Sequence, residues 1–227
     1  MSRDLALDDI QRHLREARID LWGVARNEPL LSPLAPALPT AISLVMRLHP
    51  SSLKGLDHGP TATYYYEYQR LNAGLDLAAR SLAKKLRWAG HEAEAVEATI
   101  EDDDIVKDWG NAGVFPHKTA ATQAGLGWIG KTALFVSPSL GPKVRLATVF
   151  TDLKLPAGAP ITSGRCGSCR RCIDACPAGA GRDVQWRADL TRDDLYDEKA
   201  CEHHLDGYEE FGGVCGICVA VCPYGLP

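Results

Sequence analysis

No apolar run in this chain approaches the roughly 20 residues that are needed to cross a bilayer. Residues 1–20 carry charges throughout and show no apolar core followed by small residues, so they do not form a secretory signal. Apolar residues make up 45% of the chain and charged residues 24%, which is typical of a globular protein rather than of a disordered one. We therefore expect no membrane association and a cytoplasmic location.

The sequence also has no surplus of basic residues, the usual mark of a nucleic-acid-binding protein. Its formal net charge is −4. Residues 161–227 carry seven Lys and Arg against eleven Asp and Glu, and residues 1–160 carry eighteen of each sign, so the acidic excess lies entirely in the C-terminal part. Nucleic acid is therefore not an expected partner.

Cysteine is absent before residue 166, and all eight cysteines lie between Cys166 and Cys222. The first four form the run C-x2-C-x2-C-x3-C followed by proline, which is the run of bacterial two-cluster ferredoxins. Cys215, Cys218 and Cys222, again followed by proline, repeat its last three positions, and Cys201 lies upstream in place of the missing first one. This repetition predicts two clusters.

The spacing also predicts how the ligands are shared. Two-residue spacers let successive thiolates converge on one 4Fe-4S cubane, whereas the fourth cysteine of each run faces the other cubane. We expect one cluster on Cys166, Cys169, Cys172 and Cys222, and a second on Cys176, Cys201, Cys215 and Cys218. The alternatives are zinc, which favours separated pairs of cysteines, and disulfides, which require an oxidising compartment.

The residues ahead of the cysteines alternate between helical and β-type patterns. Helical periodicity covers about residues 5–18 and, separately, a second segment from about residue 64 to Gly90. FPHKTAATQA at 115–124 is typical of a short helix. Strands are expected at 21–25, 41–48, 133–138 and 144–155, with a more ambiguous one at 93–100 and a solvated turn at EDDD, 101–104. We predict an α/β (α+β) domain over residues 1–160 and a bacterial two-cluster ferredoxin-like domain over 161–227.

The stretch GLGWIGKT, residues 125–132, fits the patterns of a phosphate-binding loop and of a dinucleotide fingerprint. Either motif requires a strand before the loop and a helix after it, so that backbone amides of the helix start can face a phosphate. Here a helical segment precedes the stretch and a β-rich run follows it. The order argues against a nucleotide site and leaves a tight glycine-rich turn.

Several stretches together resemble epoxyqueuosine reductase, a family related to reductive dehalogenases. They are AISLVMRLHP, AGLGWIGKTALFVSPSLGP, VRLATVFTDLKLP and the cysteine runs CGSCRRCIDACP and CGICVAVCP, and the resemblance covers about residues 15–225. It implies a cobalamin enzyme in which a nitroreductase-like N-terminal domain holds the corrinoid and two 4Fe-4S clusters reduce its cobalt. The glycine-rich turn would then line the corrinoid pocket, with Gly127, Gly130 and Lys131 as cofactor-binding residues.

Two departures from the family pattern affect the expected chemistry. Asn111 stands about where the family has the aspartate that donates a proton, and His117 is the candidate substitute. The chain also stops at Pro227, before the helical-repeat extension with which the family helps to hold tRNA. We therefore expect a substrate other than tRNA.

Two functions remain open from the sequence. The first is an oxidoreductase in which a low-potential donor of the ferredoxin or flavodoxin type supplies electrons, through the clusters, to a cofactor and an unknown small-molecule or protein acceptor. The cofactor would be cobalamin, with FMN as the alternative suggested by the nitroreductase-like fold. The second is a non-catalytic electron-transfer protein that serves a partner such as a corrinoid protein.

Overall fold

The computed structural model describes residues 7–27, 37–98, 116–211 and 213–225, and these form two compact units. The predicted boundary between residues 160 and 161 is one of the points at which the chain passes from the first unit to the second. The second unit also includes two earlier segments. The first unit comprises Met1–Met46, Leu71–Leu126 and Arg145–Pro160, and the second comprises Arg47–Arg70, Gly127–Val144 and Ile161–Pro227.

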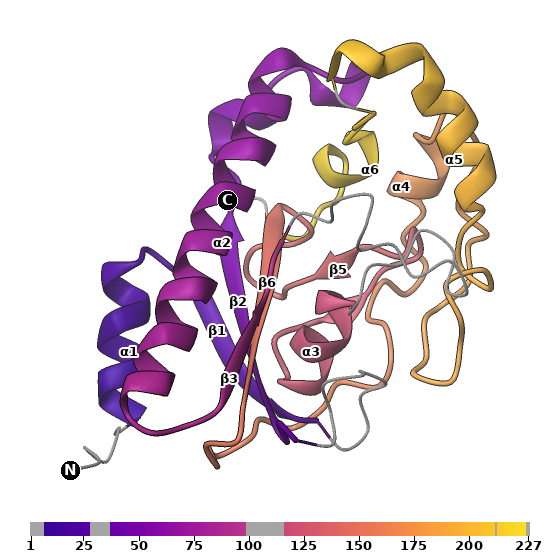
Figure 1. Cartoon of the computed structure of the whole chain (residues 1–227). Helices are drawn as coiled ribbons and strands as arrows, with labels where there is room; N and C mark the ends of the chain where they lie inside the picture. The colour runs from indigo at the N-terminus through magenta and orange to yellow at the C-terminus, as the bar shows by residue number, and fades with distance from the viewer. Residues whose placement is uncertain (1–6, 28–36, 99–115, 212, 226–227) are drawn as a thin grey trace. The chain divides into compact units, whose positions relative to one another are not determined.

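A four-stranded sheet forms the centre of the first unit (Figure 1). Strand β1 pairs antiparallel with β2, with Val24 opposite Ile42, and β3 pairs antiparallel with β6. Every residue of β2 except the last is buried, as expected for a strand that is covered on both faces. The strand order is β1 (Leu21–Arg26), β2 (Thr40–Arg47), β6 (Val144–Thr151), β3 (Ala93–Val96), which confirms four of the predicted strands.

Helices cover both faces of this sheet. Figure 1 shows α1 (Leu7–Glu16) and α2 (Ala62–Trp88) on one side and α3 (His117–Gln123) on the other. The predicted periodicity of α2 is confirmed, since its residues Leu71, Leu75, Ala78, Leu82 and Leu86 are all buried. The predicted stop is confirmed as well: Gly90 has φ 93°, and the amide of the next residue bonds back to the carbonyl of Leu86, as in a Schellman cap.

The second unit contains little regular structure. A short hairpin of β4 (Trp128–Ile129) and β5 (Phe135–Val136) contributes to a core that also includes Trp186 and Leu195. The remaining elements are single turns or short helices: η1 (Pro50–Leu53), η2 (Leu56–His58), α4 (Arg171–Asp174), α5 (Glu198–Leu205), η5 (Asp206–Phe211) and α6 (Ile217–Ala220). Such a small core is usually supplemented by metal centres or other cross-links.

The glycine-rich stretch follows the predicted order of helix, turn and strand. Helix α3 ends at Gln123, and β4 begins at Trp128. Gly127 is required by close packing, because a Cβ at this position would overlap the carbonyl oxygen of Val136 on the facing strand. The loop therefore belongs to a β-hairpin and does not open a helix.

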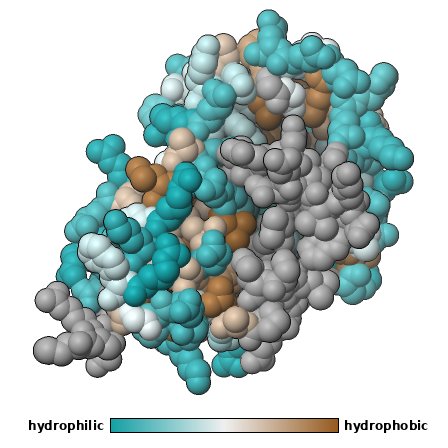
Figure 2. Space-filling model, viewed as in Figure 1, coloured by the Kyte–Doolittle hydropathy of each residue, from teal (hydrophilic) through white to brown (hydrophobic). Residues whose placement is uncertain are grey.

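Two surface features complete the description. None of the helices in the described part of the chain is both long and apolar enough to span a membrane. On the face shown in Figure 2, the described surface is mainly hydrophilic, and hydrophobic side chains appear only in separate places. The predicted turn at 101–104 and Asn111 lie outside the described residues.

Candidate iron-sulfur site

The eight cysteines are free, partly buried thiols of the second unit. Short helical turns carry three of them: Cys172 lies in α4, Cys201 in α5 and Cys218 in α6. The others lie in the turns beside these helices. Cys166 and Cys169 precede α4, Cys176 follows it, and Cys215 and Cys222 flank α6.

Electrostatic interactions link these thiols in two groups. Cys172 lies within electrostatic range of Cys166, Cys169 and Cys222, and Cys222 in turn interacts with Cys166 and Cys169. We call these four thiols the first foursome.

The remaining four form the second foursome. Cys215 interacts with Cys176 and Cys201, and Cys218 interacts with all three of these residues, as well as with Cys172 of the first foursome. Each run thus contributes one cysteine to the other's group, although the ligand assignment itself stays a prediction.

The number and kind of these ligands suit 4Fe-4S clusters. Among the described residues, no three Cys, His, Asp or Glu side chains gather closely enough to hold one metal ion. A tetrahedral zinc site would need four sulfurs about 2.3 Å from one centre. A cubane binds four thiolates, one on each of its four iron atoms, so two groups of four cysteines match the ligand count of two 4Fe-4S clusters.

Burial raises the pKa of thiols in both foursomes. Burial, with a smaller contribution from neighbouring thiols, raises the pKa of Cys172 to about 11 and that of Cys218 to about 12. Without a cation at the centre, the protonated form of these side chains is therefore strongly preferred. Cluster assembly must displace those protons, and the bound iron offsets the repulsion between the thiolates.

Hydrogen-bond donors reach sulfurs of both foursomes. In the first foursome, the Thr132 hydroxyl bonds to the side chain of Cys172, and the Tyr224 amide bonds to Cys222. In the second, the Tyr196 hydroxyl bonds to Cys201, and the Ile217 amide bonds to Cys215. Donors to cluster sulfurs stabilise the more negative, reduced cluster, so these groups are suited to adjust reduction potentials.

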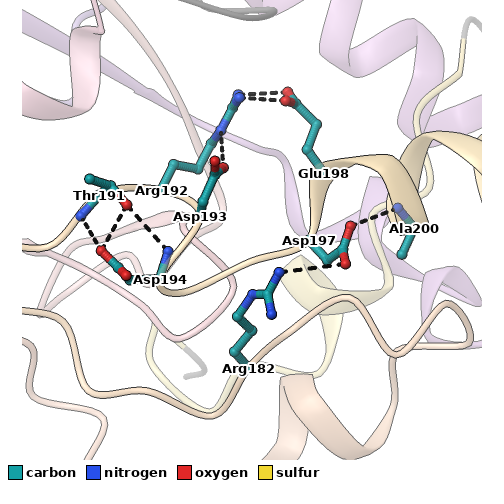
Figure 3. Close-up of polar contacts among 8 residues, drawn as sticks. All are labelled: Arg182, Thr191, Arg192, Asp193, Asp194, Asp197, Glu198 and Ala200. Carbon is teal, nitrogen blue, oxygen red and sulfur yellow. Dashed lines mark hydrogen bonds and ion pairs between the residues drawn. The ribbon is translucent and has the colours of Figure 1, made fainter.

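Polar contacts at its N-terminus fix the helix that carries Cys201 (Figure 3). The Asp197 side chain caps α5 by accepting a hydrogen bond of 3.1 Å from the Ala200 amide. Arg192 donates to both carboxylate oxygens of Glu198 in the first turn, with an Nη1–Oε1 distance of 2.6 Å. This bidentate pair and the cap orient the first turn of α5, from which Cys201 projects.

A buried lysine lies beside the first foursome, and sequence reasoning missed it. Lys143 is 2% exposed, and its ammonium donates to the backbone carbonyls of Cys222 at 2.9 Å and Tyr224 at 2.6 Å. Burial lowers the pKa of Lys143, whereas the charge of Cys222 acts in the opposite direction. No sequence motif marks this residue, because 79 positions separate it from Cys222.

The three residues predicted for a corrinoid pocket have partners within the second unit. Gly127 and Gly130 pack against β5, and a Cβ at Gly130 would lie 3.1 Å from a Val136 methyl group. Lys131 is buried and donates to Asp183 at 2.7 Å. Packing and ion pairing account for all three residues without a corrinoid, and their cofactor role stays a prediction.

The candidate proton donor His117 is partly buried in the first unit. Its Nε2 lies 2.8 Å from the backbone carbonyl of Glu97, and its Nδ1 lies 2.9 Å from the Thr148 hydroxyl. Because a carbonyl only accepts, Nε2 must carry the proton in the neutral ring, and Nδ1 then accepts from Thr148. Burial lowers the His117 pKa to about 4, so the ring has no spare proton at neutral pH.

Comparisons with known proteins agree with the cysteine geometry. Residues 165–225 match the family model of the 4Fe-4S double cluster binding domain. The tetrachloroethene reductive dehalogenase of Sulfurospirillum multivorans is 34% identical over 123 residues, which is 46% of this chain and 22% of that protein. The epoxyqueuosine reductase of Bacillus cereus is 28% identical over 214 residues, 87% of this chain and 50% of that protein.

The resemblance to epoxyqueuosine reductases and reductive dehalogenases is confirmed. Solved structures of both families share the fold. The reductive dehalogenase NpRdhA aligns with a TM-score of 0.75 at 19% identity, over 97% of this chain and 32% of its own. An epoxyqueuosine reductase bound to a tRNA-Tyr stem loop aligns with a TM-score of 0.60 at 20% identity, over 96% and 64%. The chain thus spans half or less of the length of these curated relatives.

Proposed function

We propose that this protein is an iron-sulfur oxidoreductase of the epoxyqueuosine reductase and reductive dehalogenase type. The proposal depends on one combination of observations: the chain has two groups of four cysteines, and it follows the relatives' fold over nearly its whole length. Bound 4Fe-4S clusters would supply single-electron transfer. In this proposal the first unit is the nitroreductase-like part that serves the acceptor, and the protein works in the cytoplasm, where thiols stay reduced.

The cofactor proposed for the acceptor side is cobalamin. One of the structurally similar proteins is a reductive dehalogenase described as suggesting a mechanism for B12-dependent dehalogenation. A corrinoid would supply a strongly reducing cobalt centre, and FMN is the weaker alternative. The substrate is proposed to be a small molecule or a partner protein, and the electron donor a ferredoxin or flavodoxin.

Within this proposal, the described residues hold and shape the electron path. The cysteines bind iron, Thr132 and Tyr196 donate hydrogen bonds to sulfur, and Asp197 orients the helix that carries Cys201. The single proton of the neutral His117 ring lies on Nε2, which donates a hydrogen bond to the Glu97 carbonyl, so the chemistry of the acceptor would need another proton source.

A second function is favoured by this last observation. If no residue of the chain delivers a proton, the protein would pass electrons to a partner, such as a corrinoid protein, and would turn over no substrate itself. Asn111, which stands in place of the family's aspartate, points the same way.

One experiment separates the two functions. The protein is purified without oxygen, its iron and sulfide are measured, and hydroxocobalamin is titrated in while visible and EPR spectra are recorded. Stoichiometric uptake with a base-off Co(II) signal supports the oxidoreductase. Two clusters without uptake of corrinoid or FMN would support the electron carrier and contradict our proposal.

A further inference from the structure

The two foursomes lie in unequal electrostatic surroundings. The segment 165–176, which holds most of the first foursome, carries Arg165, Arg170 and Arg171 against Asp174, a net charge of +2. The segment 197–211, which holds Cys201 of the second foursome, carries six acidic residues against a single lysine, a net charge of −5. Ion pairs with residues outside these segments reduce the contrast without reversing it, because Asp183 pairs with Arg170, and Arg182 and Arg192 pair with Asp197 and Glu198.

Lys143 adds a buried positive charge beside the first foursome. Its ammonium lies 2.9 Å from the carbonyl oxygen of Cys222, and only the C=O, C–Cα, Cα–Cβ and Cβ–Sγ bonds separate that oxygen from the sulfur. Covalent geometry thus keeps the ammonium within roughly 8 Å of the Cys222 sulfur. Both carbonyl oxygens accept hydrogen bonds from the side chain, and their dipoles stabilise a positive charge on it.

The charge of Lys143 is not balanced by a nearby carboxylate. Among the residues that the structure describes, no Asp or Glu oxygen lies within ion-pair distance of Lys143, whereas the other buried lysine of this unit, Lys131, is paired with Asp183. Arg47 contributes a further positive charge to the surroundings of Lys143. A buried cation acts over several ångströms because little water screens it.

We propose that Lys143 raises the reduction potential of the cluster on Cys166, Cys169, Cys172 and Cys222 above that of the other cluster. Reduction adds one negative charge to a cluster, and a nearby cation stabilises that charge while surrounding carboxylates oppose it. With both clusters bound, an electron from a donor of the ferredoxin or flavodoxin class, which is itself oxidised by one electron, would reside preferentially on the cluster of the first foursome. No bond forms and no proton moves in this step.

The inference rests on the presence of two clusters, which is part of the proposed function, but not on a corrinoid or a substrate. It also assigns a role to the second foursome, whose lower-potential cluster would supply electrons to the cluster of the first. The exposed residue Glu202, directly after Cys201, lies within electrostatic range of the Cys201 thiol and would act on the second cluster when that cluster is bound. Lys143 and Glu202 should thus affect the reduction potentials of two different clusters.

The test is an anaerobic redox titration of the cluster-loaded protein, followed by EPR, on wild type and variants. Lys143→Met should reduce the ratio of reduced to oxidised cluster about tenfold at the wild-type midpoint of the higher-potential step, equivalent to about 59 mV. Glu202→Gln should raise the reduced fraction of the lower-potential step by about twofold. Lys143→Arg, which keeps the charge, and Lys54→Met, which removes an exposed lysine of the same unit, should leave both steps within twofold of wild type.

Several outcomes would overturn the inference. One is a Lys143→Met protein whose titration matches that of wild type. Another is that Lys143→Met and Glu202→Gln shift the midpoint potential of the same reduction step. The third is that Lys143→Met and Lys54→Met shift the midpoint potentials equally. Should Lys143→Met fail to retain iron, Lys143→Gln, which can still donate to a carbonyl but is neutral, replaces it in the same comparison.

The proposed function fails in distinguishable ways. Wild-type protein without iron and sulfide overturns both proposals. If two clusters are present but Lys143→Met does not shift their potentials, only the role of Lys143 is overturned. If Lys143→Met shifts the potential but wild type takes up no corrinoid, only the proposed oxidoreductase function is overturned.

Discussion

Replacement of His117 by glutamine should abolish a loss of stability that the first unit undergoes in mild acid. In the folded protein the His117 pKa is lowered to about 4, chiefly by burial, whereas an unfolded histidine has its ordinary value of about 6.5. Between these two values the unfolded chain binds a proton that the folded chain does not. The stability that the neutral ring contributes is therefore fully present above about pH 6.5 and is lost as the pH falls toward 4.

The size of this effect follows from the difference between the two pKa values. A shift of about 2.5 units, at roughly 1.36 kcal/mol per unit, gives an upper limit of about 3 kcal/mol over the whole range, and about 2 kcal/mol is lost between pH 8 and pH 5. Burial is the cause of the lowered pKa, and the hydrogen bond from Nε2 to the Glu97 carbonyl acts in the opposite direction without offsetting it. The loss should therefore be local to the first unit.

Hydrogen exchange of the β6 amides, corrected for intrinsic rates, measures this loss as the free energy of opening. We expect it to fall by about 2 kcal/mol from pH 8 to pH 5 in the wild type, and by less than about 0.5 kcal/mol in H117Q. The substitution H58Q, which removes an exposed histidine, is the matched control and should keep the wild-type slope. A His117 ring that titrates near 6.5 by NMR, or an H117Q protein with the same slope as wild type, would refute the reasoning.

Two further predictions concern the second unit. Gly127→Ala should destabilise this unit by more than about 2 kcal/mol and reduce iron retention, because the new Cβ overlaps a carbonyl on the facing strand. The control is Gly207→Ala, where a Cβ meets nothing within 4 Å. Equal iron contents in the two variants would contradict the packing argument. Cys222→Ser and Cys166→Ser should each lose about half of the iron, and the double variant no more than either, because both residues serve one cluster. Cys222→Ser combined with Cys218→Ser should lose nearly all of it, and additive losses from Cys222 and Cys166 would show that the crossed assignment is wrong.

The local features of this protein are determined by its sequence alone. The periodicity of α2, its stop at Gly90 and the order of helix, turn and strand around Gly127 all follow from neighbouring residues, because backbone preference and side-chain direction act over a few positions. The spacers within each cysteine run limit which thiols of that run can converge, so the cluster ligands were predicted from spacing, and their assignment stays a prediction.

Contacts between distant parts of the chain were decided only by the tertiary structure. Lys143 lies 79 positions from Cys222 in the sequence, and His117 lies 31 positions from Thr148, so no local sequence pattern predicts either contact. The division into units behaves in the same way, since segments 47–70 and 127–144 join the cysteine-bearing part although they lie far ahead of it in the sequence. Hydrogen bonds and burial of this kind depend on the path of the whole chain. For that reason the cluster ligands could be inferred from spacing, whereas the charge that distinguishes the two foursomes could be found only in the fold.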